Sequence, residues 1–236
     1  MASPLFSIII ACHEGHDDDE MLRRTMESLR RQSLQDFEIL LYHDGPRAVP
    51  FAEALDLGRY PKLSHVESTE VRQGDFGHSL RDLGIARAIG DYVIQLDADC
   101  ILYDSALDQI ARSMEVPRKR IVIEQPSGRF VKTLDETADG HECDVFIFSI
   151  IRIGMECDGL NYWMNAKHDA RHGMLMTGRP ALPQLLDLMQ LAVRRSLWDR
   201  YGGWYDKTAG GHGEIYARLI QENWARCIPA ILGEHW

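Results

Sequence analysis

The chain has 236 residues, 45% of them hydrophobic and 26% charged, which is an ordinary balance for a globular protein with one sizeable core. Its formal net charge of −10 argues against a general nucleic-acid binder, because no surplus of positive charge is available to displace phosphate counterions. A single nucleotide stays acceptable as a ligand, since a bound metal ion can supply positive charge locally.

The first hundred residues alternate predicted strands and helices. Four strands are short, largely apolar runs: residues 6–11, 37–42, 63–66 and the run that ends at Asp97. Two helices are predicted from apolar residues at helical spacing: Leu22, Met26 and Leu29 in one, and Phe76, Leu80 and Leu83 in the other. The acids at 17–20 fit a helix start better than a metal site. We expect an α/β fold with a mostly parallel sheet.

The second half is less regular. Strands are predicted over residues 120–124, 144–153 and 227–232, and helices over 196–201 and from 210–214 onward. Residues 154–183 mix Gly, His, Met and Asn with little periodicity, as lids and acceptor pockets often do. No Pro/Ser-rich linker or internal repeat interrupts the chain, so one domain is expected.

Cysteine usage and hydropathy predict a soluble cytoplasmic protein. The five cysteines are scattered and odd in number, so they form neither a disulfide framework nor a zinc motif and suggest a reducing compartment. The N-terminus has no leader pattern, and no apolar run reaches the roughly 18 residues that a membrane span needs. Peripheral contact with a membrane stays open.

Two acids end the fourth predicted strand. Side chains at i and i+2 of a strand point the same way, so the carboxylates of Asp97 and Asp99 can converge where the strand becomes a loop. Oxygen donors at the carboxyl end of a strand suit Mg²⁺ or Mn²⁺, and ligands of open α/β sheets bind at this edge. The alternative is a pair of solvated loop acids.

Five segments in this order resemble glycosyltransferase family 2, whose members have the GT-A fold. Residues 6–10 resemble its opening strand, 35–45 its second strand and turn, 79–92 its Ala-Arg-Asn-x-Gly-Ile helix, 97–99 its DXD motif and 194–206 its acceptor-side pattern. The chain departs from the family where Ala11-Cys12-His13-Glu14 follows the first strand and where Asp82 replaces an Asn. The resemblance is weak in the middle of the chain.

The resemblance implies a GT-A, Rossmann-like fold: a mixed, mostly parallel sheet flanked by helices in a single domain over residues 1–236. Residues 1–102 would bind the nucleotide sugar and residues 103–236 the acceptor. The implied reaction moves a sugar from a nucleotide-diphosphate sugar, with a UDP-sugar favoured, to a hydroxyl of a glycan or other acceptor. Inversion is expected, and Mn²⁺ or Mg²⁺ is the implied cofactor.

The family likeness assigns metal and nucleotide contacts. Asp97 and Asp99 would hold the cation, and His235, which ends the chain after a Gly much as in some GT-A enzymes, would be a third ligand that tilts the preference towards Mn²⁺. Asp44 resembles the acid that meets the imide N–H of uracil, and Arg81 an arginine on the nucleotide side of the pocket. Each assignment has an alternative: His235 as a frayed terminal histidine, Asp44 as a turn-forming residue and Arg81 as a surface arginine.

The same likeness completes the site. Ala11, His13 and Asp97 are the other expected nucleotide contacts. The catalytic base is expected at Glu214 or His212: the family's Glu-Asp pair aligns with Gly211-His212, and Glu214 follows at the helix start, where the dipole keeps it ionised. Glu214 is the stronger candidate, and His212 has a pKa suited to base work at neutral pH.

Two aromatic residues are the expected acceptor contacts. Trp204 and Tyr205 follow a pair of glycines and would offer a platform for the apolar face of a pyranose. The alternative for Trp204 is an aromatic residue of the core.

Two other functions compete with this interpretation. A nucleotidyltransferase also places acids after a strand, but it would need a basic glycine-rich loop where residues 12–19 are acidic. A catalytically inactive module that binds sugar nucleotides or glycans stays open, because the Glu-Asp pair is missing.

Overall fold

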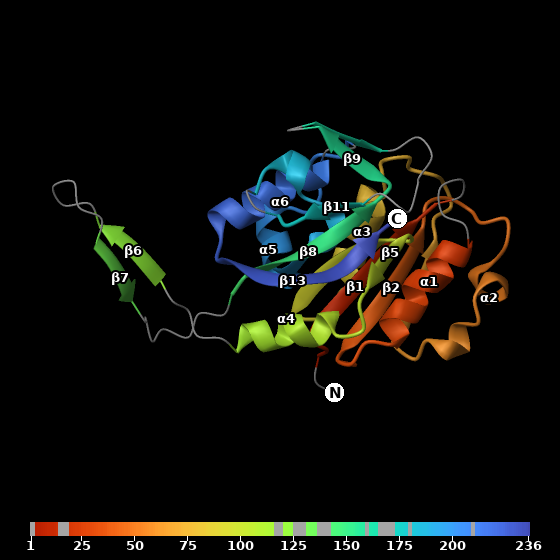
Figure 1. Ribbon diagram of the computed structural model, residues 1–236. Helices are drawn as coiled ribbons and strands as arrows, with labels where there is room; N and C mark the ends of the chain where they lie inside the picture. The colour runs from red at the N-terminus through yellow and green to blue at the C-terminus, as the bar shows by residue number, and fades with distance from the viewer. Residues whose placement is uncertain are drawn as a thin grey trace.

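The computed structural model describes residues 3–13, 19–115, 120–124, 131–135, 143–158, 161–164, 173–178, 181–208 and 211–236. Within these residues, a nine-stranded sheet has the order β3-β2-β1-β4-β12-β8-β13-β5, with β11 paired to β8 outside this path. Figure 1 shows helices packed on both faces of the sheet. The α/β architecture that the sequence predicts, a mixed sheet flanked by helices, is therefore confirmed.

The first half of the sheet is parallel. Its strands are β1 (Phe6–Cys12), β2 (Phe37–His43), β3 (Leu63–Ser68) and β4 (Tyr92–Asp97). β1 is central, because it pairs in parallel with β2 on one side and β4 on the other. Their connections contain α1 (Asp19–Arg30), α2 (Phe51–Ala54), the 3-10 helix η1 (Leu57–Arg59) and α3 (His78–Arg87).

The second half of the sheet is mixed. It contains β5 (Cys100–Leu102), β8 (Val145–Ile153), β11 (Gly173–Met176), β12 (Leu191–Arg194) and β13 (Ala225–His235). β12 runs antiparallel to both β4 and β8, and β13 runs parallel to β8. The carboxyl ends of β4, β8 and β13 therefore point to the same edge of the sheet.

Five further elements flank the sheet in this half: α4 (Ala106–Met114), α5 (Arg195–Tyr201), α6 (Gly211–Glu222), η2 (Pro183–Leu185) and η3 (Leu188–Gln190). Two antiparallel pairs form separate two-stranded sheets, β6 (Arg120–Glu124) with β7 (Val131–Asp135) and β9 (Met155–Asp158) with β10 (Asn161–Met164). Residues 154–183, for which the sequence predicted no strand, contain β9, β10 and β11. These strands have four residues each, too few for their periodicity to register in the sequence.

Alternate residues of the buried strands belong to two hydrophobic cores, one on each face of the sheet. On β1, Phe6, Ile8 and Ile10 pack with α1 and α4, whereas Ile9 and Ala11 pack with α3, α5 and α6. This two-sided burial explains why β1 is a continuous apolar run in the sequence. No helix among the described residues is long and apolar enough to cross a bilayer.

Candidate functional site

The predicted metal ligands lie together at the edge where β4 and β13 end. Asp97 is the last residue of β4, and His235 is the last residue of β13. β13 pairs with β5 so that His235 stands opposite Cys100, and the Trp236 backbone N–H donates to the Asp99 carbonyl at 3.2 Å. Residues far apart in the chain are thus joined by sheet pairing.

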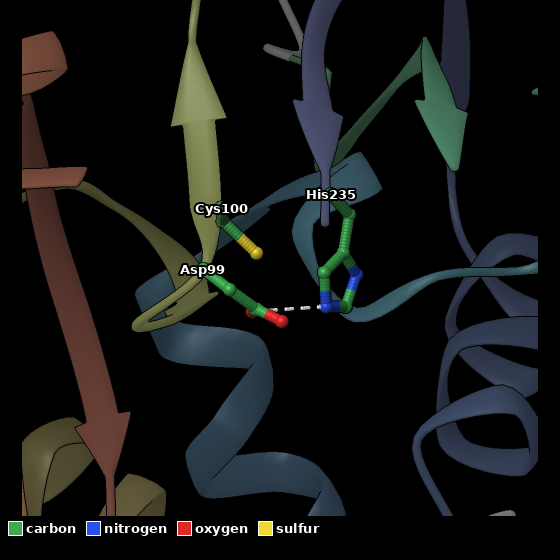
Figure 2. Close-up of side chains that lie close together, drawn as sticks. All are labelled: Asp99, Cys100 and His235. Carbon is green, nitrogen blue, oxygen red and sulfur yellow. Dashed lines mark ion pairs between the residues drawn. The ribbon is translucent and has the colours of Figure 1, made fainter. Parts of the chain in front are cut away.

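The His235 ring faces both acids. Its Nε2 lies 3.1 Å from Asp99 Oδ1 and 3.8 Å from Asp97 Oδ2. Figure 2 shows the Asp99 carboxylate directed at this edge of the ring. The His235 side chain is only 7% exposed, so a frayed terminal histidine is excluded.

These side chains fit a divalent cation. Asp99 Oδ1 is buried, and apart from His235 no described residue donates a hydrogen bond to it. A buried oxygen of this kind is expected to have a further partner. Carboxylate oxygens together with one imidazole nitrogen are donors that Mn²⁺ accepts, and Mg²⁺ shares the oxygen donors.

Cys100 lies next to this pair. Its Sγ, Asp99 and His235 offer ligand atoms that all lie within 4.8 Å of one another (Figure 2). However, complete burial and the nearby carboxylates raise the pKa of the Cys100 thiol well above its ordinary value. The sulfur also accepts the Asp97 backbone N–H at 3.4 Å. Hard cations prefer the oxygen and nitrogen donors over this protonated thiol.

Asp187 is a buried member of the site that the sequence analysis missed. It lies just before η3, and its two carboxylate oxygens are 3.0 and 2.8 Å from His235 Nδ1. Its Oδ1 also accepts the Met189 backbone N–H, and Gln190 completes a capping box. Arg152 Nη1 lies 3.7 Å from Oδ2. The only sequence signal was the Asp-x-x-Gln capping pattern, which indicates a helix start and not a functional site.

Opposite charges control ionisation in this cluster. Burial would lower the pKa of His235, but Asp187 and Asp99 outweigh burial and raise it to about 10. Burial likewise opposes ionisation of Asp99 and Asp187, yet the pKa of each carboxyl falls below its ordinary value beside His235 and Arg152. In the metal-free protein, two carboxylates therefore enclose an imidazolium.

Arg81 is buried and paired with Asp97, so the alternative of a surface arginine is wrong. Its Nη2 contacts Asp97 Oδ1, and its Nη1 donates to the Phe76 carbonyl at 2.6 Å. A Cβ at Gly77 would lie 2.6 Å from Nη1, so the preceding loop needs glycine here to close over the guanidinium. The structure thus brings two predicted nucleotide contacts, Arg81 and Asp97, together.

Asp44 is buried at the end of β2, where its carboxylate orders the loop after β3. Oδ1 accepts the Gln73 backbone N–H at 2.7 Å, and Oδ2 accepts that of Gly74 at 2.9 Å. This is the turn-forming role that the sequence left open. Each oxygen still has a second lone pair, so the arrangement is compatible with a ligand donor.

Ala11 and His13 lie at the same edge. Ala11 stands opposite Asp97 in the pairing of β1 with β4, and it is buried beneath the Gly77 loop. His13 is half-buried, with Nδ1 3.4 Å from Arg72 Nη2. Both residues therefore flank the carboxyl ends of the parallel strands, as a nucleotide site requires.

The two candidate bases differ sharply in position. Successive helical residues turn by about 100°, so two residues two apart lie on nearly opposite faces of α6. His212 is half-buried and interacts electrostatically with Asp187 and Asp97, whereas Glu214 is exposed. The start of α6 is docked closely, since a Cβ at Gly213 would overlap the Pro183 backbone. His212, and not Glu214, thus lies on the side of α6 that is near the acids of the site.

The expectation that Trp204 contacts the acceptor was also wrong. Trp204 is 2% exposed, and its ring stacks on His78 at 4.5 Å between centroids, with Trp198 and Tyr216 close by. No ring face is left for a sugar. Tyr205, the adjacent residue, is 53% exposed, and its contact with the acceptor stays a prediction.

Several predicted features lie outside the described residues. They are Glu14, the acids at 17 and 18, and Gly210. Asp19 and Glu20 do fall in the first turn of α1, as expected of a helix start.

A sequence model described as glycosyl transferase family 2 matches residues 7–183 of this chain. No curated protein matches it. Many solved structures show the same fold, and three of them illustrate it. The crystal structure of TarS from S. aureus has a TM-score of 0.65 and 12% identity, over 98% of this chain and 36% of TarS.

A second TarS structure, residues 1–349 in complex with UDP-GlcNAc, has a TM-score of 0.64 and 12% identity, over 97% of this chain and 57% of that one. The mannosyltransferase PcManGT from Pyrobaculum calidifontis, in complex with GDP-Man and Mn²⁺, has a TM-score of 0.61 and 13% identity, over 99% of this chain and 57% of PcManGT. This chain thus spans between 36% and 57% of these relatives.

Proposed function

The chain belongs to glycosyl transferase family 2, and from that premise we propose that it moves a sugar from a nucleotide-diphosphate sugar to an acceptor hydroxyl, with inversion. The convergence of Asp99 and His235, beside Asp97, at the edge where β1, β2 and β4 end is the observation that carries the proposal. Family membership counts against the nucleotidyltransferase alternative. The inactive binding module is left to experiment.

Asp99 and His235 would hold Mn²⁺ or Mg²⁺, with Asp97 as the nearest further oxygen donor. When bound, such a cation offsets the charge that gathers on a departing diphosphate. The nitrogen donor favours Mn²⁺ over Mg²⁺. Arg81 would orient Asp97, because its guanidinium contacts that carboxylate from the buried side.

A UDP-sugar is the favoured donor. The Asp44 carboxylate can accept the imide N–H of uracil with a lone pair that its two backbone contacts leave open. Cytosine presents an acceptor at the same ring position and would be disfavoured. Relatives crystallised with UDP-GlcNAc and with GDP-Man agree with a nucleotide sugar in general, so the preference for uridine depends on Asp44.

His212 is the proposed base. Burial lowers its pKa below the ordinary value of 6.5, against the opposing effect of Asp187 and Asp97. The imidazole is therefore neutral at pH 7 and can accept the proton of an acceptor hydroxyl. The acceptor would be a glycan or another hydroxyl compound, and Tyr205 is its proposed aromatic contact.

Both halves of the chain contribute to the proposed site. Residues 1–102 would bind the nucleotide sugar and residues 103–236 the acceptor, yet His235 from the second half completes the metal ligands. We also propose a cytoplasmic location. The odd number and scattered positions of the five cysteines support a reducing compartment.

Hydrolysis of a UDP-sugar panel in the presence of Mn²⁺ tests the proposal, with Asp99→Asn as the inactive control. Turnover of one or a few UDP-sugars in the wild type, lost in the variant, is expected. In parallel, thermal unfolding with each nucleotide and Mn²⁺ would report binding. A shift with UDP but no turnover would favour the inactive binding module, and no shift with any nucleotide would overturn the proposal.

A further inference from the structure

Asp187 has no part in the function proposed above, yet it contacts the proposed metal ligand His235 directly. We propose that Asp187 is the positioning residue of the metal site, which holds His235 through Nδ1 so that Nε2 faces the cation. This inference rests on the proposed function, because it concerns the same metal site. It adds a residue outside the predicted ligand set.

The geometry assigns the two ring nitrogens different partners. Nδ1 lies 2.8 Å from Asp187 Oδ2, whereas Nε2 lies 3.1 Å from Asp99 Oδ1. Because Nδ1 donates to Asp187, the proton on Nε2 is the one that a cation would replace. A carboxylate on the far nitrogen also makes the imidazole a more basic ligand and fixes the plane of its ring.

A carboxylate at position 187 is not explained by local structure. Its role as the cap of η3 needs only an acceptor for the Met189 N–H, which a neutral Asn or Ser supplies equally well. Asp187 is 7% exposed, and a buried charge is costly unless it is paired. Arg152 is the other cation near it, at 3.7 Å. The shorter contact is to His235, so the negative charge of Asp187 is paired mainly with the imidazole ring.

Position in the fold supports the same role. Asp187 precedes η3, which is packed against β4, while His235 ends β13. The contact therefore fixes the end of β13 to the start of η3, which packs against the strand that carries Asp97. Among the described residues, the other acids that contact the His235 ring are Asp97 and Asp99, which would themselves be ligands of the cation.

Binding of Mn²⁺ to the metal-free protein, followed by electron paramagnetic resonance of the free ion, tests the proposal without any catalytic readout. Asp187→Asn keeps the cap of η3 and removes the charge, and we expect it to weaken Mn²⁺ binding by about 10- to 100-fold. Gln190→Ala is the matched control, because it breaks the same capping box, and the hydrogen bonds described for Gln190 go to Asp187, Phe148 and Met176 rather than to His235. Its Mn²⁺ affinity should stay within about twofold of the wild type.

A double variant separates positioning from general loosening of the site. If Asp187 acts through His235, then adding Asp187→Asn to His235→Ala should cost less than about twofold in Mn²⁺ affinity. Equal affinity of the wild type and Asp187→Asn would overturn this inference and leave the proposed function standing. A wild type that binds no Mn²⁺ would overturn both.

A measurement on the wild type covers the case in which Asp187→Asn does not fold. Long-range ¹H–¹⁵N correlation spectra report which nitrogen of His235 carries the proton in the presence of Mg²⁺. A proton on Nδ1, with Nε2 deprotonated, is expected. A proton on Nε2 with Nδ1 deprotonated would overturn the proposal.

Discussion

His212 and Glu214 stand two positions apart on α6, and burial alone distinguishes them at the scale of the residue. Glu214 is exposed to water on one face of the helix, whereas His212 is half-buried among Asp97, Asp187 and Arg81. Because a base must be within reach of the proton that it accepts, position outweighs the intrinsic merits of a carboxylate. The difference is directly testable.

His212→Gln should lower kcat by about 10²- to 10⁴-fold, the range that general base catalysis contributes. Binding of UDP with Mn²⁺, measured by calorimetry, should be retained, because His212 is not among the proposed donor contacts. Glu214→Gln is the matched control and should keep near wild-type turnover. Equal losses in both variants, or in neither, would contradict the assignment of the base.

The pH dependence gives an independent check on His212. Burial lowers its pKa below 6.5, so the imidazole is neutral above that value and protonated at lower pH. A protonated imidazole cannot accept a proton, so kcat/KM should fall as the pH falls through this pKa. The acid limb should be absent from the residual activity of His212→Gln. A limb centred clearly above pH 6.5 would contradict the environment described for this residue.

Trp204 belongs to the core rather than to the acceptor site, and its removal should act on stability. Trp204→Ala leaves a cavity among His78, Trp198 and Tyr216, and we expect it to lower the free energy of unfolding by about 3–5 kcal/mol. Denaturant unfolding measures this loss. Tyr205→Ala, one residue on and exposed, should change stability by no more than about 0.5 kcal/mol.

At the scale of elements, the connection from α3 to β4 fixes the strand that carries Asp97. Gly90 lies in this connection, and a Cβ there would be 2.5 Å from the Ser7 backbone nitrogen. Its own N–H donates to Ser7 Oγ at 2.8 Å, and Ser7 in turn donates to Glu38 at 2.6 Å. The beginnings of β4, β1 and β2 are thus tied together at the edge opposite the site.

Gly90→Ala should destabilise the protein by about 1–3 kcal/mol or more, because the added methyl meets backbone that cannot yield as a side chain can. Gly58→Ala is the matched control: its nearest neighbour is an Asp56 oxygen at 3.5 Å, and no left-handed backbone is required there. That variant should be neutral or stabilising by up to about 1 kcal/mol. Denaturant midpoints compare the two, and equal effects would contradict the close packing.

At the scale of the whole molecule, the site joins the two halves of the chain. Asp97 and Asp99 come from the first half, whereas His235 and Asp187 come from the second. A net charge of −10 and a cluster of buried carboxylates leave little positive charge to receive a diphosphate. A cation at this position would supply the missing charge and link the halves.

Metal removal should therefore weaken nucleotide binding more than it affects the fold. At UDP concentrations about 100 times Kd, the bound state gains about 2.7 kcal/mol, which corresponds to a rise in Tm of about 5–10 °C for a chain of this size. This rise should appear with UDP and Mn²⁺ together and disappear when EDTA is added. An equal rise with UDP in EDTA would contradict the role of the cation.

Local patterns in the sequence determined the elements and half of the site. Apolar runs and helical spacing predicted β1, β2, β4 and α1, because burial on a strand or a helix repeats with a fixed short period. The Asp97 and Asp99 pair was visible for the same reason, since Asp97 ends an apolar strand and Asp99 follows in the next turn. The resemblance to a family added His235 through its place after the last strand.

Tertiary structure alone decided which side chains meet. Asp187 and His235 are 48 residues apart, and no local pattern links them. The burial of Trp204 and Arg81, and the burial of His212 rather than Glu214, depend on how α3, α5 and α6 pack on the sheet. Contacts between distant segments do not repeat with a period along the chain, so the sequence could offer only candidate residues. Tertiary packing then decided which charged side chains are partners.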